Sequence, residues 1–183
     1  MRLFTAIDLP APVLDTLARL LDRLRPTAHL KWSPIENLHI TTKFIGEWPE
    51  SRRAELESAL RSLGSFEPIP IRLRGLGFFP NPQAPRVFWV GVEAGPDLAE
   101  LARRTDAALA RLGVPPETRP FSPHLTLARI KEPVPLSGLR QAIARLETVE
   151  FGEFRADRFY LYLSELRPAG SVYTKLSEFP FTP

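Results

Sequence analysis

Two short segments of the sequence place a histidine two residues before a threonine, among apolar neighbours. The first segment is NLHITTKFIG, around His39, and the second is SPHLTLARI, around His124. The two histidines lie nearly half the chain apart, in similar surroundings. A repeat of this kind predicts two related halves, each of which contributes one strand to a shared groove.

The spacing within each segment suits a β-strand, because residues i and i+2 of a strand point to the same face. His39 therefore shares a face with Thr41, and His124 shares a face with Thr126. The opposite faces are apolar and are expected in the core, at Ile40, Leu125 and Leu127. The alternative is that these are the polar faces of two half-buried strands, since Thr favours strands. Two matching pairs in a chain with only three histidines argue against that alternative.

Paired histidines and threonines have the groups that phosphodiester hydrolysis needs. One neutral imidazole takes a proton from water, and one charged imidazolium gives a proton to the leaving oxygen, because histidine titrates near neutral pH. Each transfer contributes typically about 10² to 10⁴ in rate. Threonine hydroxyls can donate hydrogen bonds to the phosphate oxygens as negative charge builds in the transition state.

Other hydrolytic chemistries have no matching motif. A catalytic zinc usually has three protein ligands, whereas this chain has no cysteine, no His-Glu-x-x-His and no acidic cluster beside either motif. A Gly-x-x-x-x-Gly-Lys-Ser/Thr loop for ATP and a Gly-x-Ser-x-Gly nucleophile elbow are both absent. We therefore favour chemistry without a metal.

The composition is that of an ordinary globular protein, with 44% hydrophobic and 25% charged residues among 183. A net charge of +3 permits an RNA partner without requiring one. No run of eighteen apolar residues predicts a membrane span, and the N-terminus lacks the apolar core of a signal peptide. A cytoplasmic location fits best.

Strand and helix patterns are interleaved along the chain, and several strands follow one another directly. Leucines at helical spacing predict helices over 12–25, 49–63, 98–112 and 139–146, the third ended by Gly113. Strands are expected over 2–8, 38–45, 69–78, 86–93, 124–130, 154–163 and 172–179. This order favours an α+β fold with antiparallel sheet, and no linker divides the chain into separate domains.

At these motifs the sequence resembles the 2H phosphoesterase superfamily, and within it the RNA 2′,3′-cyclic phosphodiesterases, historically called 2′-5′ RNA ligases. The likeness covers nearly the whole chain, through RLFTAIDLP, WSPIENLHITTKFIGEW, FSPHLTLARI and LYLSELRPAGSVYTKL. It implies one bilobal α+β domain over residues 1–183. The lobes would be interleaved and related by a pseudo-twofold axis, with duplicated antiparallel sheets, helices outside and a central active-site groove.

The resemblance also implies the reaction: hydrolysis of a terminal 2′,3′-cyclic phosphate of RNA to a 2′-phosphate, without metal or other cofactor. By the family's usual assignment His39 is the general acid and His124 the general base, and the order would swap for the opposite regiochemistry. Thr41 and Thr126 would bind phosphate oxygens. RNA is the partner implied; no membrane or protein partner is, and the chain is expected to be a monomer.

Two basic residues are further candidates for substrate binding. Arg129 matches the family's arginine, but its offset of five from His124 is odd, so it would face away from His124 in an unbroken strand. Either a β-bulge or an arm reaching round the strand end is needed to bring it to the groove, and the alternative is a solvent-facing Arg. Lys43, four residues after His39, is expected on the histidine face, where it either adds positive charge or is merely solvated. Three aromatic side chains could stack on a base, although packing in the structure is the favoured interpretation for Phe4, Trp32 and Phe44.

Two other functions remain open at this stage. The same groove could cleave 2′-5′ linkages or run the reaction backwards as an ATP-independent ligation. The chain could also be a non-catalytic module that binds RNA ends, although binding alone does not require two titratable groups.

Overall fold

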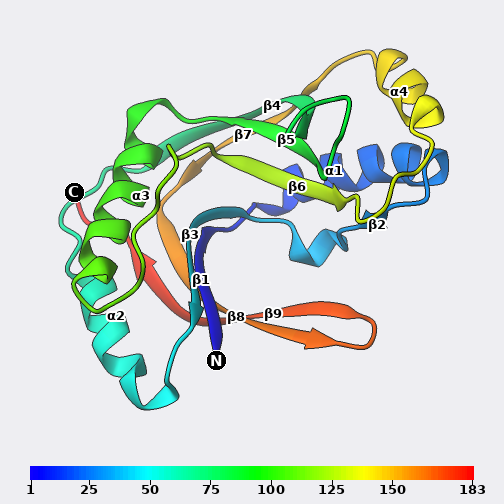
Figure 1. Cartoon of the computed structure of the whole chain (residues 1–183). Helices are drawn as coiled ribbons and strands as arrows, with labels where there is room; N and C mark the ends of the chain where they lie inside the picture. Colours follow the sequence, from blue (N-terminus) through cyan, green and yellow to red (C-terminus); the bar gives the residue numbers. More distant parts are fainter.

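A computed structural model describes residues 1–183 as an α+β fold built on two antiparallel sheets, as the sequence predicts (Figure 1). The strands are β1 (Arg2–Ile7), β2 (Lys31–Trp32), β3 (Ile40–Glu47), β4 (Ile69–Phe79), β5 (Val87–Glu93), β6 (His124–Arg129), β7 (Glu150–Ala156), β8 (Arg158–Arg167) and β9 (Gly170–Pro180). The helices are α1 (Ala11–Leu24), α2 (Arg53–Arg61), α3 (Gly95–Ala110) and α4 (Ser137–Ala144). Short 3₁₀ turns cover 25–27, 35–37 and 50–52.

The two sheets repeat one strand order. One sheet runs β3-β1-β8-β9 and the other runs β6-β5-β4-β7, with β2 added beyond β6. Each His-x-Thr motif therefore belongs to the corresponding strand of its own sheet, β3 or β6. The internal repeat read from the sequence is thus a repeat of topology, with one motif strand in each half.

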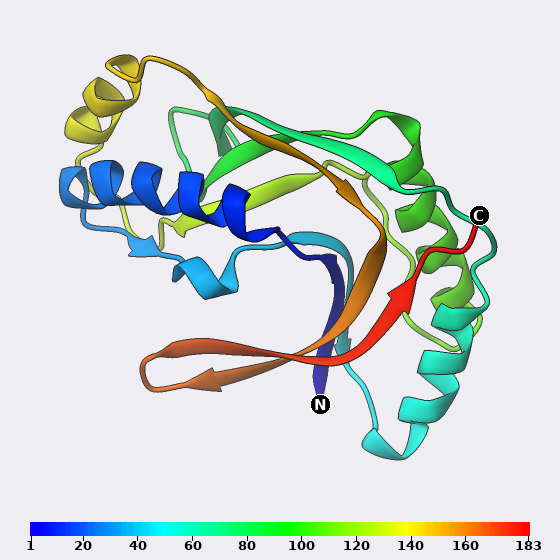
Figure 2. The same cartoon turned by 180° about the vertical axis from the view of Figure 1, so that it is seen from behind.

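The helices tie the two halves together. Helix α1 follows β1 of the first sheet but packs against β7 of the second, whereas α3 follows β5 of the second sheet and packs against β3 of the first. Figures 1 and 2 show α1 and α4 at one end of the molecule and α2 and α3 at the other. None of these helices is long and apolar enough to cross a bilayer.

A single cluster of 33 buried residues forms the main core between the sheets and the helices. It contains the three apolar motif residues predicted to face inward, and each is fully buried: Ile40, Leu125 and Leu127. Burial of these side chains removes apolar surface from water, at about 25 cal/mol per Å², and so holds each motif strand with its polar face outward. The core therefore positions the histidines.

Two expectations about the strands are wrong in detail. The single strand expected over 154–163 is two strands, β7 and β8, which separate at Asp157 and belong to different sheets. Apolar residues alternate within each strand, but the alternation shifts by one residue between Ala156 and Phe159, where two polar residues follow one another. Lys31–Trp32, which lies outside every expected strand, forms the short edge strand β2. The third helix ends just before Gly113, whose φ of 98° suits a glycine.

Candidate active site

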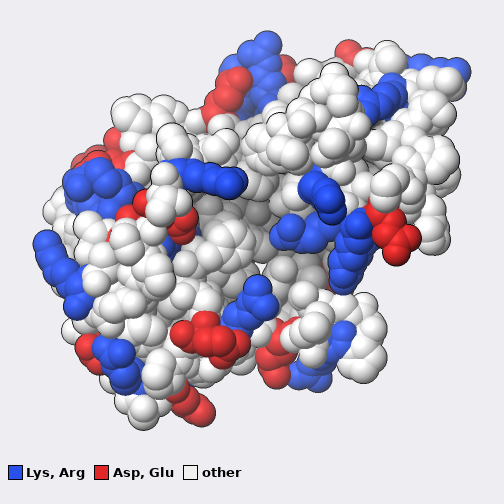
Figure 3. Space-filling model, in the orientation of Figure 1, with Lys and Arg blue, Asp and Glu red and all other residues white.

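A groove with a volume of about 580 Å³ lies between the two sheets and is lined by both His-x-Thr pairs. His39 immediately precedes β3 and Thr41 lies near its start, whereas His124 and Thr126 both belong to β6. The face shown in Figure 3 is hollowed near its centre, with several basic side chains around the hollow. Tertiary structure thus brings together four residues that the sequence predicts for one site.

Each histidine is oriented by a backbone carbonyl two residues earlier in the chain. Nδ1 of His39 lies 2.7 Å from the oxygen of Asn37, and Nδ1 of His124 lies 2.9 Å from the oxygen of Ser122. A carbonyl oxygen can only accept, so Nδ1 carries the hydrogen in both rings. Nε2 is consequently the atom of each imidazole that can exchange a proton with a substrate.

The surroundings of the two rings differ. Nε2 of His39 lies 2.8 Å from Oγ1 of Thr41, and the ring packs against Phe4, with centroids 4.8 Å apart, and edge-on against Tyr173 at 5.3 Å. In contrast, Nε2 of His124 makes no hydrogen bond within the protein, and Phe79 is the one aromatic ring paired with it, edge-on at 5.0 Å.

Burial lowers the pKa of His39 below its ordinary value, because the charged imidazolium is poorly solvated among these aromatic rings. The hydrogen bond from the His39 ring to the Asn37 carbonyl raises the pKa of His39. The positive charges of Arg129 and His124 lower the pKa further, and Asp8 raises it. His39 is therefore disposed to be neutral while the groove holds no anion.

A β-bulge follows each motif. Pairing of β3 with β1 skips Thr42, since Thr41 lies opposite Ala6 and Lys43 lies opposite Thr5. Pairing of β6 with β5 skips Leu127 in the same way. An extra residue in one strand reverses which later residues face the groove.

The bulge in β6 accounts for the odd offset of Arg129 from His124. It turns this exposed side chain to the groove side, where Arg129 lines the same cavity as the two histidines. The location of Arg129 at the groove is therefore confirmed, and its contact with substrate stays a proposal.

The expected location of Lys43 is wrong for the corresponding reason. The bulge at Thr42 turns Lys43 away from the groove, and its side chain is buried. The Lys43 ammonium donates to Asp106 at 2.8 Å and to Glu117 at 3.1 Å, and also to the oxygen of Pro115 at 2.9 Å. Lys43 thus links β3 to α3 and to the loop after it, and is not available to a substrate.

The same bulge brings an unexpected residue into the groove. Phe44 is 62% exposed and lines the groove, whereas packing in the structure was the favoured interpretation. Phe4 and Trp32 follow that interpretation: Phe4 stacks on Tyr162, and Trp32 packs on Phe88. The signal for Phe44 was available in the repeat, because Phe44 lies three residues after Thr41, as Arg129 lies three residues after Thr126.

Sequence reasoning also missed groove residues that come from other strands. Arg2 of β1, Ser171 and Tyr173 of β9 and Leu166 near the end of β8 line the cavity beside the motifs. No motif marks them, because only the pairing of β1, β8 and β9 brings them to the first histidine. No group of three or more His, Asp or Glu side chains is arranged to hold a metal ion.

This fold, with one histidine–threonine strand in each of two matching sheets, is that of the LigT-like 2H phosphoesterases. The family model for the 2′-5′ RNA ligase superfamily matches residues 13–167 of the chain. A protein of Methanothermobacter thermautotrophicus named RNA 2′,3′-cyclic phosphodiesterase is 39% identical over 181 residues, with 98% of both chains covered. This chain belongs to the 2′-5′ RNA ligase superfamily.

Solved structures agree with this membership. The crystal structure of TT0787 of Thermus thermophilus is 37% identical and superposes with a TM-score of 0.83, covering 99% of this chain and 98% of that one. E. coli LigT complexed with 3′-AMP is 26% identical, with a TM-score of 0.79, and 100% and 98% of the two chains are covered.

Proposed function

We propose that this protein hydrolyses the terminal 2′,3′-cyclic phosphate of RNA to a 2′-phosphate by paired-histidine acid–base catalysis, without a metal. The observation that carries the proposal is the convergence of two His-x-Thr pairs on one groove, with Nε2 of each imidazole as the exchangeable site. Relatives with 39% and 38% identity are named RNA 2′,3′-cyclic phosphodiesterase, and E. coli LigT binds 3′-AMP. These names support an RNA-end substrate.

In the proposed reaction a water molecule attacks the cyclic phosphorus while the bond from phosphorus to O3′ breaks. Nε2 of His124 takes the proton from the water, and Nε2 of His39 gives a proton to O3′. The products are a 2′-phosphate and a 3′-hydroxyl. His39 is then neutral and His124 charged, and exchange with solvent restores both. Hydroxyl groups of Thr41 and Thr126 would donate to the non-bridging oxygens, where charge increases in the transition state.

The acid role of His39 requires that the substrate change its protonation. Burial disfavours the imidazolium in the empty groove. A phosphate anion beside Nε2 supplies the opposite charge that favours the imidazolium.

Replacing the bridging O3′ of the substrate with sulfur tests this assignment, because a thiolate leaves without a proton. The sulfur substrate should restore turnover to His39→Ala and leave His124→Ala inactive. Rescue of His124→Ala instead would exchange the two roles.

The function itself is tested with purified protein, EDTA and a short RNA that ends in a 2′,3′-cyclic phosphate. A 2′-phosphate product, absent with the His39→Ala and His124→Ala variants, is the expected result. An unchanged cyclic end that nevertheless binds the protein would favour an RNA-end binding module. A joined product in the presence of a 5′-hydroxyl strand would favour ligation.

A further inference from the structure

Four basic side chains gather where β6 leaves the groove, and we call them the β2–β6 patch: Lys31, Arg86, Arg129 and Lys131. Lys31 lies directly opposite Arg129 in the pairing of β2 with β6. The amide of Ile130, between Arg129 and Lys131, donates to the oxygen of Arg86 at 2.9 Å. All four side chains are exposed.

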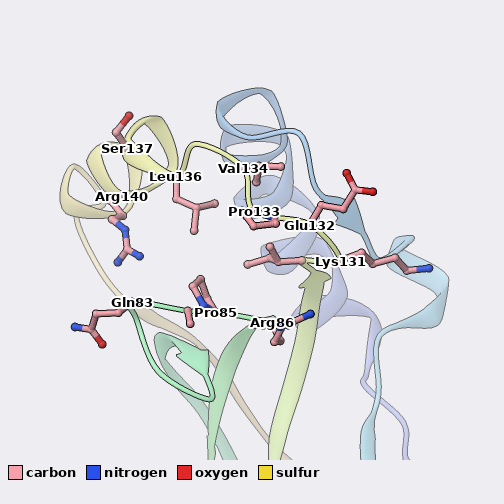
Figure 4. Close-up of a pocket in the computed structure, with 12 residues that line it drawn as sticks. Gln83, Pro85, Arg86, Lys131, Glu132, Pro133, Val134, Leu136, Ser137 and Arg140 are labelled. Carbon is pink, nitrogen blue, oxygen red and sulfur yellow. The ribbon is translucent and has the colours of Figure 1, made fainter.

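This patch has no acidic partner. Eleven of the 24 Lys and Arg residues form ion pairs with carboxylates, and none of the four is among them. Glu132 is the nearest acid in sequence, yet its side chain diverges from that of Lys131 (Figure 4). The patch therefore carries uncompensated positive charge.

The cations of the patch influence one another. The ammonium of Lys131 is close enough to that of Lys31 to lower its pKa, first as a competing hydrogen-bond donor and then by charge repulsion, and Arg129 adds to the effect. Two ammonium groups held this way repel, and an anion between them relieves the repulsion. The arrangement is suited to a bound phosphate.

The patch continues the groove. Arg129 belongs to both, since it lines the cavity that contains the histidines. It follows Thr126 by three residues, about 10 Å along a strand that rises roughly 3.3 Å per residue. Beyond it, Arg86 and Lys131 border a second cavity of about 510 Å³, shown in Figure 4. The basic surface thus leads away from the site of the terminal phosphate.

We propose that the β2–β6 patch binds the phosphodiester backbone of the RNA immediately upstream of its cyclic end. This inference rests on the proposed function, and it specifies the substrate class as oligonucleotides in preference to cyclic mononucleotides. An exposed row of Lys and Arg suits an extended chain of phosphates, because such contacts position a nucleic acid without reading its sequence. Lys31 and Lys131 are its binding residues outside the groove.

The experiment compares the double variant Lys31→Gln/Lys131→Gln with Arg23→Gln/Arg111→Gln, which removes the same charge at exposed sites on α1 and after α3. Each protein is given a 2′,3′-cyclic mononucleotide and a six-nucleotide RNA with a cyclic end, over a range of salt concentrations. In the lysine variant, kcat/KM for the RNA relative to the mononucleotide should fall roughly tenfold at low salt. The salt slope of log kcat/KM for the RNA should shrink by about 1.4, or about 0.7 for each lost phosphate contact.

An unchanged ratio and salt slope in the lysine variant would overturn the proposal, as would an equal loss in the arginine control. Anisotropy of a labelled six-nucleotide RNA with a 2′-phosphate end separates this test from the proposed function. If the parent protein hydrolysed neither substrate, the proposed function would fail. The patch would still be judged by whether the lysine variant alone weakens binding of that RNA.

Discussion

The two motif strands share one backbone design and differ in the side chains placed on it. In both β3 and β6 a histidine is held through Nδ1 by a carbonyl, a threonine follows two residues later, and a β-bulge comes next. The residue three positions after the threonine then faces the groove, and it is Phe44 in one strand and Arg129 in the other. The repeated fold sets the positions, and each lobe supplies different chemistry at them.

Packing makes the two histidines unequal as well. His39 lies among aromatic rings and is bonded to Thr41, while Nε2 of His124 and Oγ1 of Thr126 have no partner within the protein. Different surroundings give the two imidazoles different affinities for a proton. The asymmetry comes from the strands beside each motif, because β1, β8 and β9 enclose only the first histidine.

The largest effect should come from removing either histidine. His39→Ala and His124→Ala should each lower kcat by about 10² to 10⁴, since each removes one proton transfer. Steady-state hydrolysis of an RNA with a cyclic end measures this loss, and circular dichroism checks the fold. His29→Ala, an exposed histidine outside the groove, is the control and should keep full activity. Activity above about a tenth in either groove variant would exclude the acid–base pair.

The next largest losses of kcat should come from replacing the threonines, and the two losses should differ in size. Thr126→Val should lower kcat by about 10², because it removes a free hydroxyl donor to the transition state. Thr41→Val should have the smaller effect, since its hydroxyl is already bonded to His39. Measuring kcat and KM for both variants decides the order. Equal losses of kcat would mean that substrate binding breaks the bond between Thr41 and His39, so that both hydroxyls donate equally. The two threonines would then not differ in function.

Replacing Phe44 or Arg129 should weaken RNA binding, and only the effect of Arg129 should depend on the salt concentration. Phe44→Ala should raise KM for RNA about tenfold at every salt concentration, because stacking on a base contributes about 1–3 kcal/mol without using charge. Arg129→Gln should raise KM mainly at low salt and reduce the salt slope by about 0.7. KM measured from low to high salt separates them. The same salt dependence in both variants would contradict the division between stacking and charge.

Replacing Lys43 should lower the stability of the fold without changing catalysis. Lys43→Met should lower the free energy of unfolding by about 1–3 kcal/mol, because it leaves Asp106 and Glu117 without their cation, and both carboxylates retain some solvent. Urea unfolding measures this loss. We expect kcat/KM to be unchanged. A lower kcat/KM in the folded variant would mean that Lys43 contributes to substrate binding or catalysis.

The same contact should give stability a dependence on pH. Burial alone would raise the pKa of Asp106, but the Lys43 ammonium and the Glu117 amide lower it below 3.8. A lowered carboxyl pKa stabilises the fold above about pH 3.8, and this stabilisation is lost as pH falls through the lower folded value. Unfolding measured from pH 6 to 3 should show a smaller acid loss in Lys43→Met than in the parent protein.

Much of the site could be predicted from the sequence because it depends on short-range pattern. The i, i+2 spacing orients His39 with Thr41 and His124 with Thr126, and hydrophobic residues such as Ile40 and Leu125 hold these strands against the core. The odd offset of Arg129 predicted a bulge or an arm reaching round the strand end, and the pairing of β6 with β5 shows the bulge, at Leu127. No such requirement pointed to the bulge at Thr42, so Lys43 and Phe44 were placed on the wrong faces.

The sequence by itself determined the two histidine–threonine pairs, the α+β pattern and the apolar faces that orient the motifs, because these depend on residue type and periodicity. Tertiary structure decided which residues surround the pairs. Strand pairing placed Tyr173 beside His39 and Lys31 beside Arg129, across long stretches of chain. It also set the two bulges, since whether a strand skips a residue depends on the partner strand as well as on its own sequence.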